Sequence, residues 1–201
     1  IKNTNLLTRI QLEKELNIKF LKNSLLCTYH PCTIKNYDWK KEFLNLIKEL
    51  IKFKNTTVIF TKSNADEGGE FINQYLLKTI NNKENFYLFD SLGQKLYLSV
   101  LREVDIVIGN SSSAIYEAPY LKTPSIDIGA RQENRAAPNS VFKAKANSSS
   151  INRAFKDAAE FSFKNFKHLY GSGLTSERII KKLIQLRSFN NMVSEKFHDL
   201  T

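Results

Sequence analysis

Short apolar runs, each bounded by polar or glycine-containing turns, recur along the chain as far as residue 128 and predict β-strands. Their length favours buried strands over helices. Between them, apolar residues recur at intervals of three and four, which is the spacing of amphipathic helices. The predicted strands cover residues 25–29, 57–60, 86–89, 105–108 and 125–128, and the helical spacing is clearest at 43–51, 71–76 and 96–101.

Strands that alternate with helices predict a fold class. Each crossover from one strand through a helix to the next strand gives parallel pairing, and the helices then cover both faces of the sheet. The almost continuous apolar character of the strand segments agrees with burial on both faces. The expected fold is therefore α/β, with a Rossmann-like doubly wound parallel sheet.

The two ends of the chain depart from this alternation. Thr8 and Gln11 have the capping-box pattern of a short helix that continues to about Asn17. After Arg131 the pattern loosens into a loop rich in Asn, Ala and Ser. Two further helices are predicted at about 151–161 and 175–186, and the polar tail at 190–201 is expected to fray.

The length of the chain suits one domain. With 201 residues, of which 42% are hydrophobic, it is long enough for one well-buried core and short for two. We therefore expect a single domain over residues 1–201. Because the sequence starts with Ile1 rather than Met, we also expect it to be part of a longer polypeptide.

The net charge of +10, from 30 Lys and Arg against 20 Asp and Glu, raises the question of nucleic-acid binding. The lysines, however, are spread over the predicted helix faces and mixed with acidic residues such as Glu42 and Glu49. No arginine-rich run with interleaved aromatic residues occurs. This pattern favours a solvated basic surface over a surface that attracts anionic ligands, and it favours both over nucleic-acid binding.

Two cysteines, Cys27 and Cys32, are too few for a disulfide framework, and their spacing is not that of a zinc or redox motif. A cytoplasmic location is therefore expected. No apolar run approaches the roughly 20 residues that span a bilayer, so no membrane partner is expected. The sequence also predicts no metal ion and no cofactor.

Polar and glycine residues follow all five predicted strands. In an open parallel sheet, ligands bind beyond the carboxyl ends of the strands, so these segments should converge on one crevice. They are His30-Pro31, Ser63 to Asp66, Asp90 to Gly93, Gly109 to Ser113 and Gly129 to Arg131.

The fourth of these segments has the features of an anion site. Gly109 permits a tight turn, and Ser111 to Ser113 would bring hydroxyl and N–H groups to the start of the helix that carries Glu117. A serine that merely caps this helix is the alternative. Arg131 after the next strand favours the anion site, because a guanidinium binds two phosphate oxygens at once. Taken alone, Arg131 would equally suit a surface ion pair.

Glu117 and His30 extend this hypothesis to a nucleotide. Glu117 lies one and a half helical turns beyond Ser111, where a carboxylate suits the two hydroxyl donors of a ribose better than a phosphate. A solvated helix residue is the alternative. His30 is either a structural histidine or a proton donor and phosphate contact. Pro31 favours an extended backbone at His30, as at a strand end.

Four segments carry a resemblance to a known family. They are T-Y-H-P-C-T at 28–33, I-G-N-S-S-S-A-I-Y-E-A-P at 108–119, T-P-S-I-D-I-G-A-R-Q at 123–132 and Y-G-S-G at 170–173. Their combined order and spacing resemble the hydrolysing UDP-N-acetylglucosamine 2-epimerases of sialic and related nonulosonic acid biosynthesis. The similarity extends from about Thr28 to Leu183. It implies the C-terminal domain of a two-domain glycosyltransferase-B-like fold, without the N-terminal half that supplies the acid and base carboxylates.

The resemblance also implies a reaction and a set of site residues. UDP would leave by anti elimination to give a 2-acetamidoglucal, and addition of water would give N-acetylmannosamine, while this half stabilises the diphosphate. The implied partner is UDP-N-acetylglucosamine or a related UDP-sugar, in a homo-oligomeric full-length protein. The implied residues are Ser111 and Ser112 for the diphosphate, Glu117 for the ribose, His30 and Arg131 for the diphosphate and reacting sugar, Asn64 elsewhere in the site, and Phe89, Ser91 and Leu92 for uracil.

Three positions depart from the family pattern, and other interpretations stay open. Ala114 and Asn134 stand where Gly is usual, and would constrain the phosphate loop if those positions need positive φ; Ala130 often is Asp or Thr. A non-hydrolysing 2-epimerase or a glycosyltransferase would share the fold, since fold does not fix function. A catalytically silent nucleotide-binding or oligomerisation module is the alternative of a different class. The sequence leaves open whether the sugar is N-acetylglucosamine or a diacetylated bacillosamine derivative.

Overall fold

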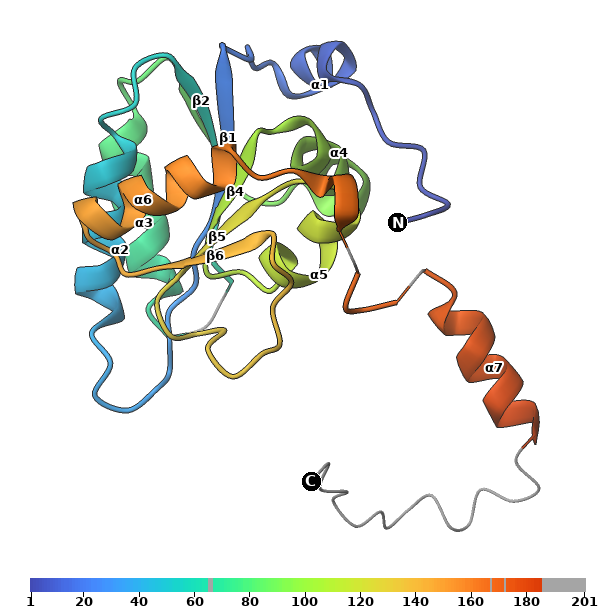
Figure 1. Ribbon diagram of the computed structural model, residues 1–201. Helices are drawn as coiled ribbons and strands as arrows, with labels where there is room; N and C mark the ends of the chain where they lie inside the picture. Colours follow the sequence, from blue (N-terminus) through green and yellow to red (C-terminus); the bar gives the residue numbers. More distant parts are fainter. Residues whose placement is uncertain (65–66, 167, 172, 186–201) are drawn as a thin grey trace. The chain divides into compact units, whose positions relative to one another are not determined.

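The computed structural model describes residues 1–64, 67–166, 168–171 and 173–185, and the chain forms two compact units, residues 1–169 and 170–201. The first unit is built on a six-stranded parallel sheet in the order β3-β2-β1-β4-β5-β6 (Figure 1). This is the strand order of Rossmann folds, which reverses between β1 and β4. The strands are β1 Asn23–Thr28, β2 Thr56–Thr61, β3 Phe86–Phe89, β4 Ile106–Gly109, β5 Ser125–Ile128 and β6 Val141–Ala144.

Helices cover both faces of the sheet, as Figure 1 shows. On one face, α2, α3 and α6 pack on a core that includes Leu25 and Cys27 of β1. On the other, α1, α4 and α5 pack on a second core that includes Leu26. Because successive side chains of a strand point to opposite faces, one strand serves both cores. The helices are α1 Arg9–Leu16, α2 Trp39–Leu50, α3 Gly69–Ile80, α4 Gly93–Glu103, α5 Ser113–Tyr120 and α6 Ser148–Ala159, followed by a 3₁₀ turn at Phe163–Asn165.

The doubly wound α/β fold predicted from the sequence is confirmed. All five predicted strands are present, and Thr8 and Gln11 form the predicted capping box at the start of α1. Strand β6 was not predicted, since the segment after Arg131 was expected to be a loop. Three of the four residues of β6 are partly or fully exposed, so this edge strand lacks the continuous apolar run that marks the central strands.

The second unit contains α7, Thr175–Gln185, which confirms the last predicted helix up to residue 185. Its apolar residues Ile179, Ile180, Leu183 and Ile184 are exposed. The tail at 190–201 lies outside the described residues. Among the residues that are described, no helix has both the length and the apolar character needed to cross a membrane. Both cysteines of the chain are free and buried in the first unit.

Candidate functional site

An open cavity of about 480 Å³ lies at the carboxyl ends of β1 to β4. One wall comes from the segment between β3 and α4, and the other from the turn between β4 and α5. The residues singled out from the sequence that line it are His30, Ser91, Leu92, Ser111, Ser112 and Glu117.

The turn between β4 and α5 is held in a conformation that requires glycine. Gly109 has a φ of 136°, and a Cβ at this position would lie 2.0 Å from the carbonyl oxygen of Thr28 on the neighbouring strand. The close approach of the two strands lets the chain turn directly into α5. The N-terminus of that helix therefore faces the cavity with its positive dipole end.

The two serines that precede α5 differ in their hydrogen bonds. Ser112 is the N-cap residue of α5, but its side chain makes no capping hydrogen bond. The alternative of a serine that caps this helix stays open, because Ser111 Oγ accepts from the N–H of Ser113 at 3.4 Å. With N–H groups, two hydroxyls and a dipole directed to one cavity, this corner is suited to bind an anion.

Asn110 joins three strand ends and was not singled out from the sequence. It is fully buried, and its side chain makes a reciprocal pair of hydrogen bonds with the backbone of His30, at 2.7 and 2.8 Å. The backbone carbonyl oxygen of Asn110 accepts from Arg131 Nη1 at 3.1 Å and from Gln132 Nε2 at 2.7 Å. Asn110 therefore fixes the segments that follow β1 and β5 relative to the serine turn.

The imidazole of His30 lies at the gap between the ends of β1 and β2. Its Nδ1 is 3.3 Å from Ser63 Oγ and 3.2 Å from Asn64 Oδ1, and the Asn64 N–H donates to it at 3.3 Å. These contacts bring Asn64 to the site, although it does not line the cavity. The ring is held by neighbouring polar groups at the cavity wall, where it can contact or protonate a ligand oxygen.

Glu117 presents an unpaired oxygen at the cavity. It is half-buried on α5, and within the described part of the chain its Oε2 is buried without a hydrogen-bond partner. Burial raises the pKa of this carboxyl. A ligand with two adjacent hydroxyl donors would satisfy the carboxylate and offset its desolvation. No group of three or more His, Cys, Asp or Glu side chains suited to a metal ion is found in the described ranges.

Arg131 and Phe89 lie near the cavity but do not form its wall. One N–H of the Arg131 guanidinium is engaged by the Asn110 carbonyl oxygen, and a guanidinium has further donors for a ligand. Phe89 is the last residue of β3 and packs against the second core with its side chain. The residues that follow Phe89, Asp90 to Leu92, line the cavity.

A hydrogen-bonded cluster supports the loop that carries Arg131. The Glu42 carboxylate accepts from the hydroxyls of Tyr29 and Tyr37, and the Tyr37 hydroxyl accepts from the Ala130 N–H at 3.1 Å. Gly129 has a φ of 77°, and a Cβ there would lie 2.2 Å from the Glu42 carboxylate. The glycine thus permits the close contact that anchors this loop to α2.

The departures from the family pattern do not strain the backbone. The positive-φ residues other than glycine in the described ranges are Asn17, Asn36 and Lys122. Ala114 is a buried residue in the first turn of α5, and Asn134 also has no positive φ. The expected constraint on the phosphate loop is therefore absent at both positions.

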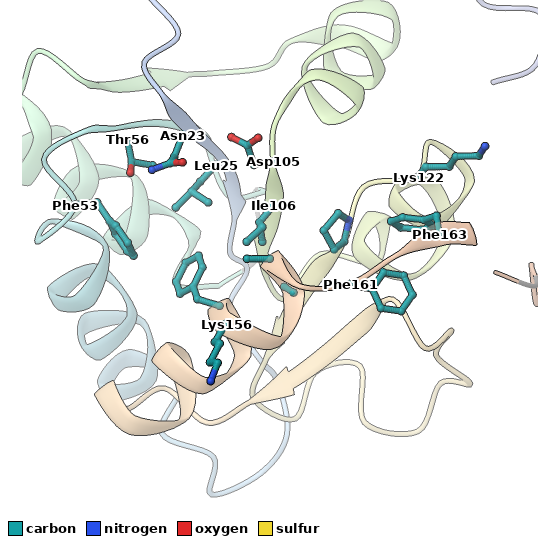
Figure 2. A pocket seen from close by; sticks show the side chains of 14 residues that line it. Asn23, Leu25, Phe53, Thr56, Asp105, Ile106, Lys122, Lys156, Phe161 and Phe163 are labelled. Atoms are coloured by element: carbon teal, nitrogen blue, oxygen red, sulfur yellow. The ribbon is translucent and has the colours of Figure 1, made fainter. Parts of the chain in front are cut away.

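Two other cavities differ from the site in chemistry or position. The one in Figure 2, of about 590 Å³, opens at the amino ends of the strands and is lined by aromatic side chains such as Phe53, Phe161 and Phe163. Another, of about 750 Å³, lies beside the start of α6 near Glu42 and Arg153. Because ligands of open parallel sheets bind at the carboxyl ends near the reversal of strand order, the cavity between β1 and β4 is the candidate site.

Known proteins with related sequences share this architecture. A family profile described as UDP-N-acetylglucosamine 2-epimerase matches residues 2–184. The chain is 39% identical to the GDP/UDP-N,N'-diacetylbacillosamine 2-epimerase (hydrolyzing) of Campylobacter jejuni, over 100% of this chain and 53% of that protein. It is 29% identical to the UDP-N-acetylglucosamine 2-epimerase of Neisseria meningitidis, over 86% of this chain and 46% of that one. The chain thus spans about half the length of these relatives.

Solved structures show the same fold at lower identity. The UDP-GlcNAc 2-epimerase of Methanocaldococcus jannaschii in complex with UDP-GlcNAc and UDP gives a TM-score of 0.67 at 17% identity, over 87% of this chain and 48% of that chain. The S. aureus MnaA–UDP structure gives 0.65 at 16% identity, over 98% of this chain and 52% of that one. At these identities the similarity concerns the fold.

Proposed function

Because the chain belongs to the UDP-N-acetylglucosamine 2-epimerase family, as its sequence segments predicted, we propose that it is the nucleotide-binding half of a hydrolysing 2-epimerase. The substrate is a UDP-linked N-acetylated amino sugar, a feature shared by the names of the two relatives above. The products are UDP and the free 2-epimeric sugar, N-acetylmannosamine when the substrate is UDP-N-acetylglucosamine.

One observation supports this proposal above the others. The serine turn before α5 and Glu117 on that helix line one cavity; the Ser112 side chain makes no capping hydrogen bond, and within the described residues the Glu117 carboxylate has a buried oxygen without a partner. A diphosphate needs donors and positive potential, whereas a ribose diol offers donors and needs an acceptor. The spacing of Ser111, just before α5, and Glu117 on α5 supplies both in the order in which they occur in UDP.

The proposed reaction divides between the two halves of the full protein. A base from the other half removes the C2 proton, and the electron pair forms a C1=C2 double bond as the C1–O bond to the diphosphate breaks. UDP leaves with that bonding pair, and water then adds its hydroxyl to C1 while a proton returns to C2 on the opposite face. This chain stabilises the charge that develops on the leaving diphosphate, and His30 contacts or protonates it.

We also propose a setting for this activity. The free cysteines support a reducing cytoplasm. The full-length protein would act as a homo-oligomer in the biosynthesis of sialic or related acids. The basic surface of the chain, with a net charge of +10, would be a solvated surface rather than a nucleic-acid site.

Calorimetry with the 201-residue chain tests the nucleotide site. UDP should bind, UMP more weakly, and uridine hardly at all, because the diphosphate contacts supply most of the affinity. Equal affinities for UDP and uridine would contradict the proposal. The chain alone should not release UDP from UDP-N-acetylglucosamine, since the carboxylates that move protons belong to the other half.

Product analysis with the full-length protein separates the hydrolysing reaction from its alternative. Free UDP and a free 2-epimeric sugar should accumulate when either UDP-N-acetylglucosamine or UDP-diacetylbacillosamine is supplied. An epimerised nucleotide sugar without free UDP would identify a non-hydrolysing epimerase. Nucleotide binding without turnover of either sugar would identify a silent module.

A further inference from the structure

Tyr97 reaches the serine turn from the neighbouring helix. It lies on α4, packs against the second core, and lines the candidate cavity. Its hydroxyl is 2.5 Å from Ser113 Oγ, and Ser113 Oγ donates to Ser111 Oγ at 3.2 Å. The three hydroxyl groups therefore form a chain from the protein interior to the cavity.

The direction of the protons along this chain follows from a count of donors. A serine hydroxyl has one proton, and that of Ser113 is used in the bond to Ser111. Ser113 must then accept from Tyr97, so the Tyr97 hydroxyl is the donor at the interior end. Ser111 Oγ accepts from both the hydroxyl and the N–H of Ser113, the latter at 3.4 Å. Its own proton is left to point into the cavity.

We propose that Tyr97 is a positioning residue, which orients the hydroxyl of Ser111 as a hydrogen-bond donor to the diphosphate. This inference rests on the proposed function and adds a residue on a different helix to the phosphate site. Hydrogen bonds in a chain polarise one another, so each donor upstream strengthens the donor that meets the ligand.

Burial keeps the relay in one protonation state. It raises the pKa of Tyr97, so the phenol retains its proton throughout the neutral range. Ser113 is 7% exposed, which leaves water little access to compete for its hydroxyl. Without the proton from Tyr97, the Ser113 hydroxyl has no fixed donor and the Ser111 proton is free to turn towards it.

Conservative variants test the relay by calorimetry with UDP. Tyr97→Phe should weaken UDP binding about three- to tenfold, the usual effect of one buried hydrogen bond. Ser113→Ala should have a similar effect because it interrupts the same chain. Tyr87→Phe is the matched control: its hydroxyl accepts from the Lys19 N–H at 3.1 Å, outside the cavity, and its UDP affinity should equal that of the parent.

A double-mutant cycle separates the relay from simple packing. In a Ser111→Ala background, Tyr97→Phe should have almost no further effect on UDP affinity, because the group it orients is gone. An undiminished effect there would show that Tyr97 contacts the ligand itself or only supports the fold, and would overturn the inference. UDP affinity of Tyr97→Phe equal to the parent would do the same while leaving the proposed function intact. Failure of the parent to bind UDP would instead contradict the proposed function.

Discussion

The amino and carboxyl ends of the strands form two edges of the sheet, and the polar groups at these edges differ in their hydrogen bonding. At the amino ends of the strands, Asp105 accepts from both the N–H and the hydroxyl of Ser24, at 2.6 and 2.8 Å. Asn85 donates to the carbonyl oxygens of Phe53 and Thr56. These groups tie neighbouring segments together, and the cavity at this edge is lined largely by aromatic and aliphatic side chains (Figure 2).

At the carboxyl ends, buried polar atoms lack partners. Within the described part of the chain, the buried oxygens without a hydrogen bond include Oε2 of Glu117, both carboxylate oxygens of Asp127, and Oε1 of Gln132. The amino edge has one comparable atom, Oγ of Ser140 before β6. Unsatisfied buried groups cost about 1 to 3 kcal/mol each, so a fold tolerates them where a ligand or a function compensates. The difference between the edges therefore indicates that a ligand binds at the carboxyl edge.

Among substitutions at the carboxyl edge, Arg131→Ala should cause the largest loss of UDP affinity. Arg131→Ala removes charge-assisted hydrogen bonds worth about 1.5 to 3 kcal/mol, so UDP affinity should fall about ten- to a hundredfold, and UMP affinity by less. Calorimetry measures both. Arg102→Ala is the control, because Arg102 bonds to Leu7 and Glu103 and should leave UDP affinity unchanged. An Arg131→Ala variant that binds UDP like the parent would remove Arg131 from the site.

Ionisation of Asp127 at the carboxyl edge should destabilise the fold above about pH 6. It is 1% exposed, and burial raises its pKa from 3.8 to about 6. The folded protein then holds this proton more tightly than the unfolded chain, so the stability it contributes is complete below about pH 4 and lost as pH rises through 6. At about 1.4 kcal/mol per pKa unit, Asp127→Asn should stabilise the fold by about 3 kcal/mol at pH 7.5 and by almost nothing at pH 4.

Thermal melting tests the prediction for Asp127, with Asp105 at the amino edge as the comparison. At pH 7.5, Asp127→Asn should raise Tm by about 6 to 12 °C. Asp105→Asn should lower Tm, because a neutral amide oxygen is a weaker acceptor than the carboxylate oxygen that receives both hydrogen bonds from Ser24. If Asp127→Asn destabilises the protein at pH 7.5, the carboxylate has a native partner and the contrast between the edges is wrong.

Substitutions of Asn110 and Asn85 should differ in their effect on UDP affinity, although both should lower Tm. Asn110→Ala frees the backbone of His30 and should weaken UDP binding about tenfold as well as lower Tm. Asn85→Ala removes a comparable pair of backbone contacts at the amino edge, so it should lower Tm without changing UDP affinity. Equal UDP affinities for both folded variants would mean that Asn110 is structural only.

Substitution of Glu117 should cause the smallest loss of UDP affinity, and the loss should depend on the ribose hydroxyls. Glu117→Gln should weaken UDP binding about fivefold, since a neutral acceptor replaces a charged one. It should leave 2′,3′-dideoxy-UDP almost unchanged, because that analogue has no ribose hydroxyls to donate. An equal loss for both ligands would place Glu117 elsewhere than at the ribose.

The sequence predicted the parts of the site that follow from strand and helix periodicity. Each of the five predicted strands ends in a polar or glycine segment, and in a parallel sheet those ends must meet at one edge. The positions of Ser111 and Glu117 in the cavity wall followed from that rule together with helical spacing. The family segments added the expectation of a nucleotide.

What the sequence did not predict depends on contacts between distant segments. Nothing near Asn110 marks it as the partner of His30, because the two are 80 residues apart in the chain. The same holds for Tyr97 on α4 and for the Tyr37 hydroxyl that supports Ala130. A buried amide or phenol has no periodicity of its own, so only the fold brings these groups to the site.

Chemical-shift mapping of the 15N-labelled 201-residue chain during titration with UDP tests the central claim most directly, because it compares both edges of the sheet in one sample. The account predicts that the amide resonances of Ser111, Ser112 and Glu117 shift with a common saturation curve, while those of Asn23 and Thr56 at the other edge stay in place. Shifts confined to the amino edge, or an absence of saturable shifts at the start of α5, would contradict it.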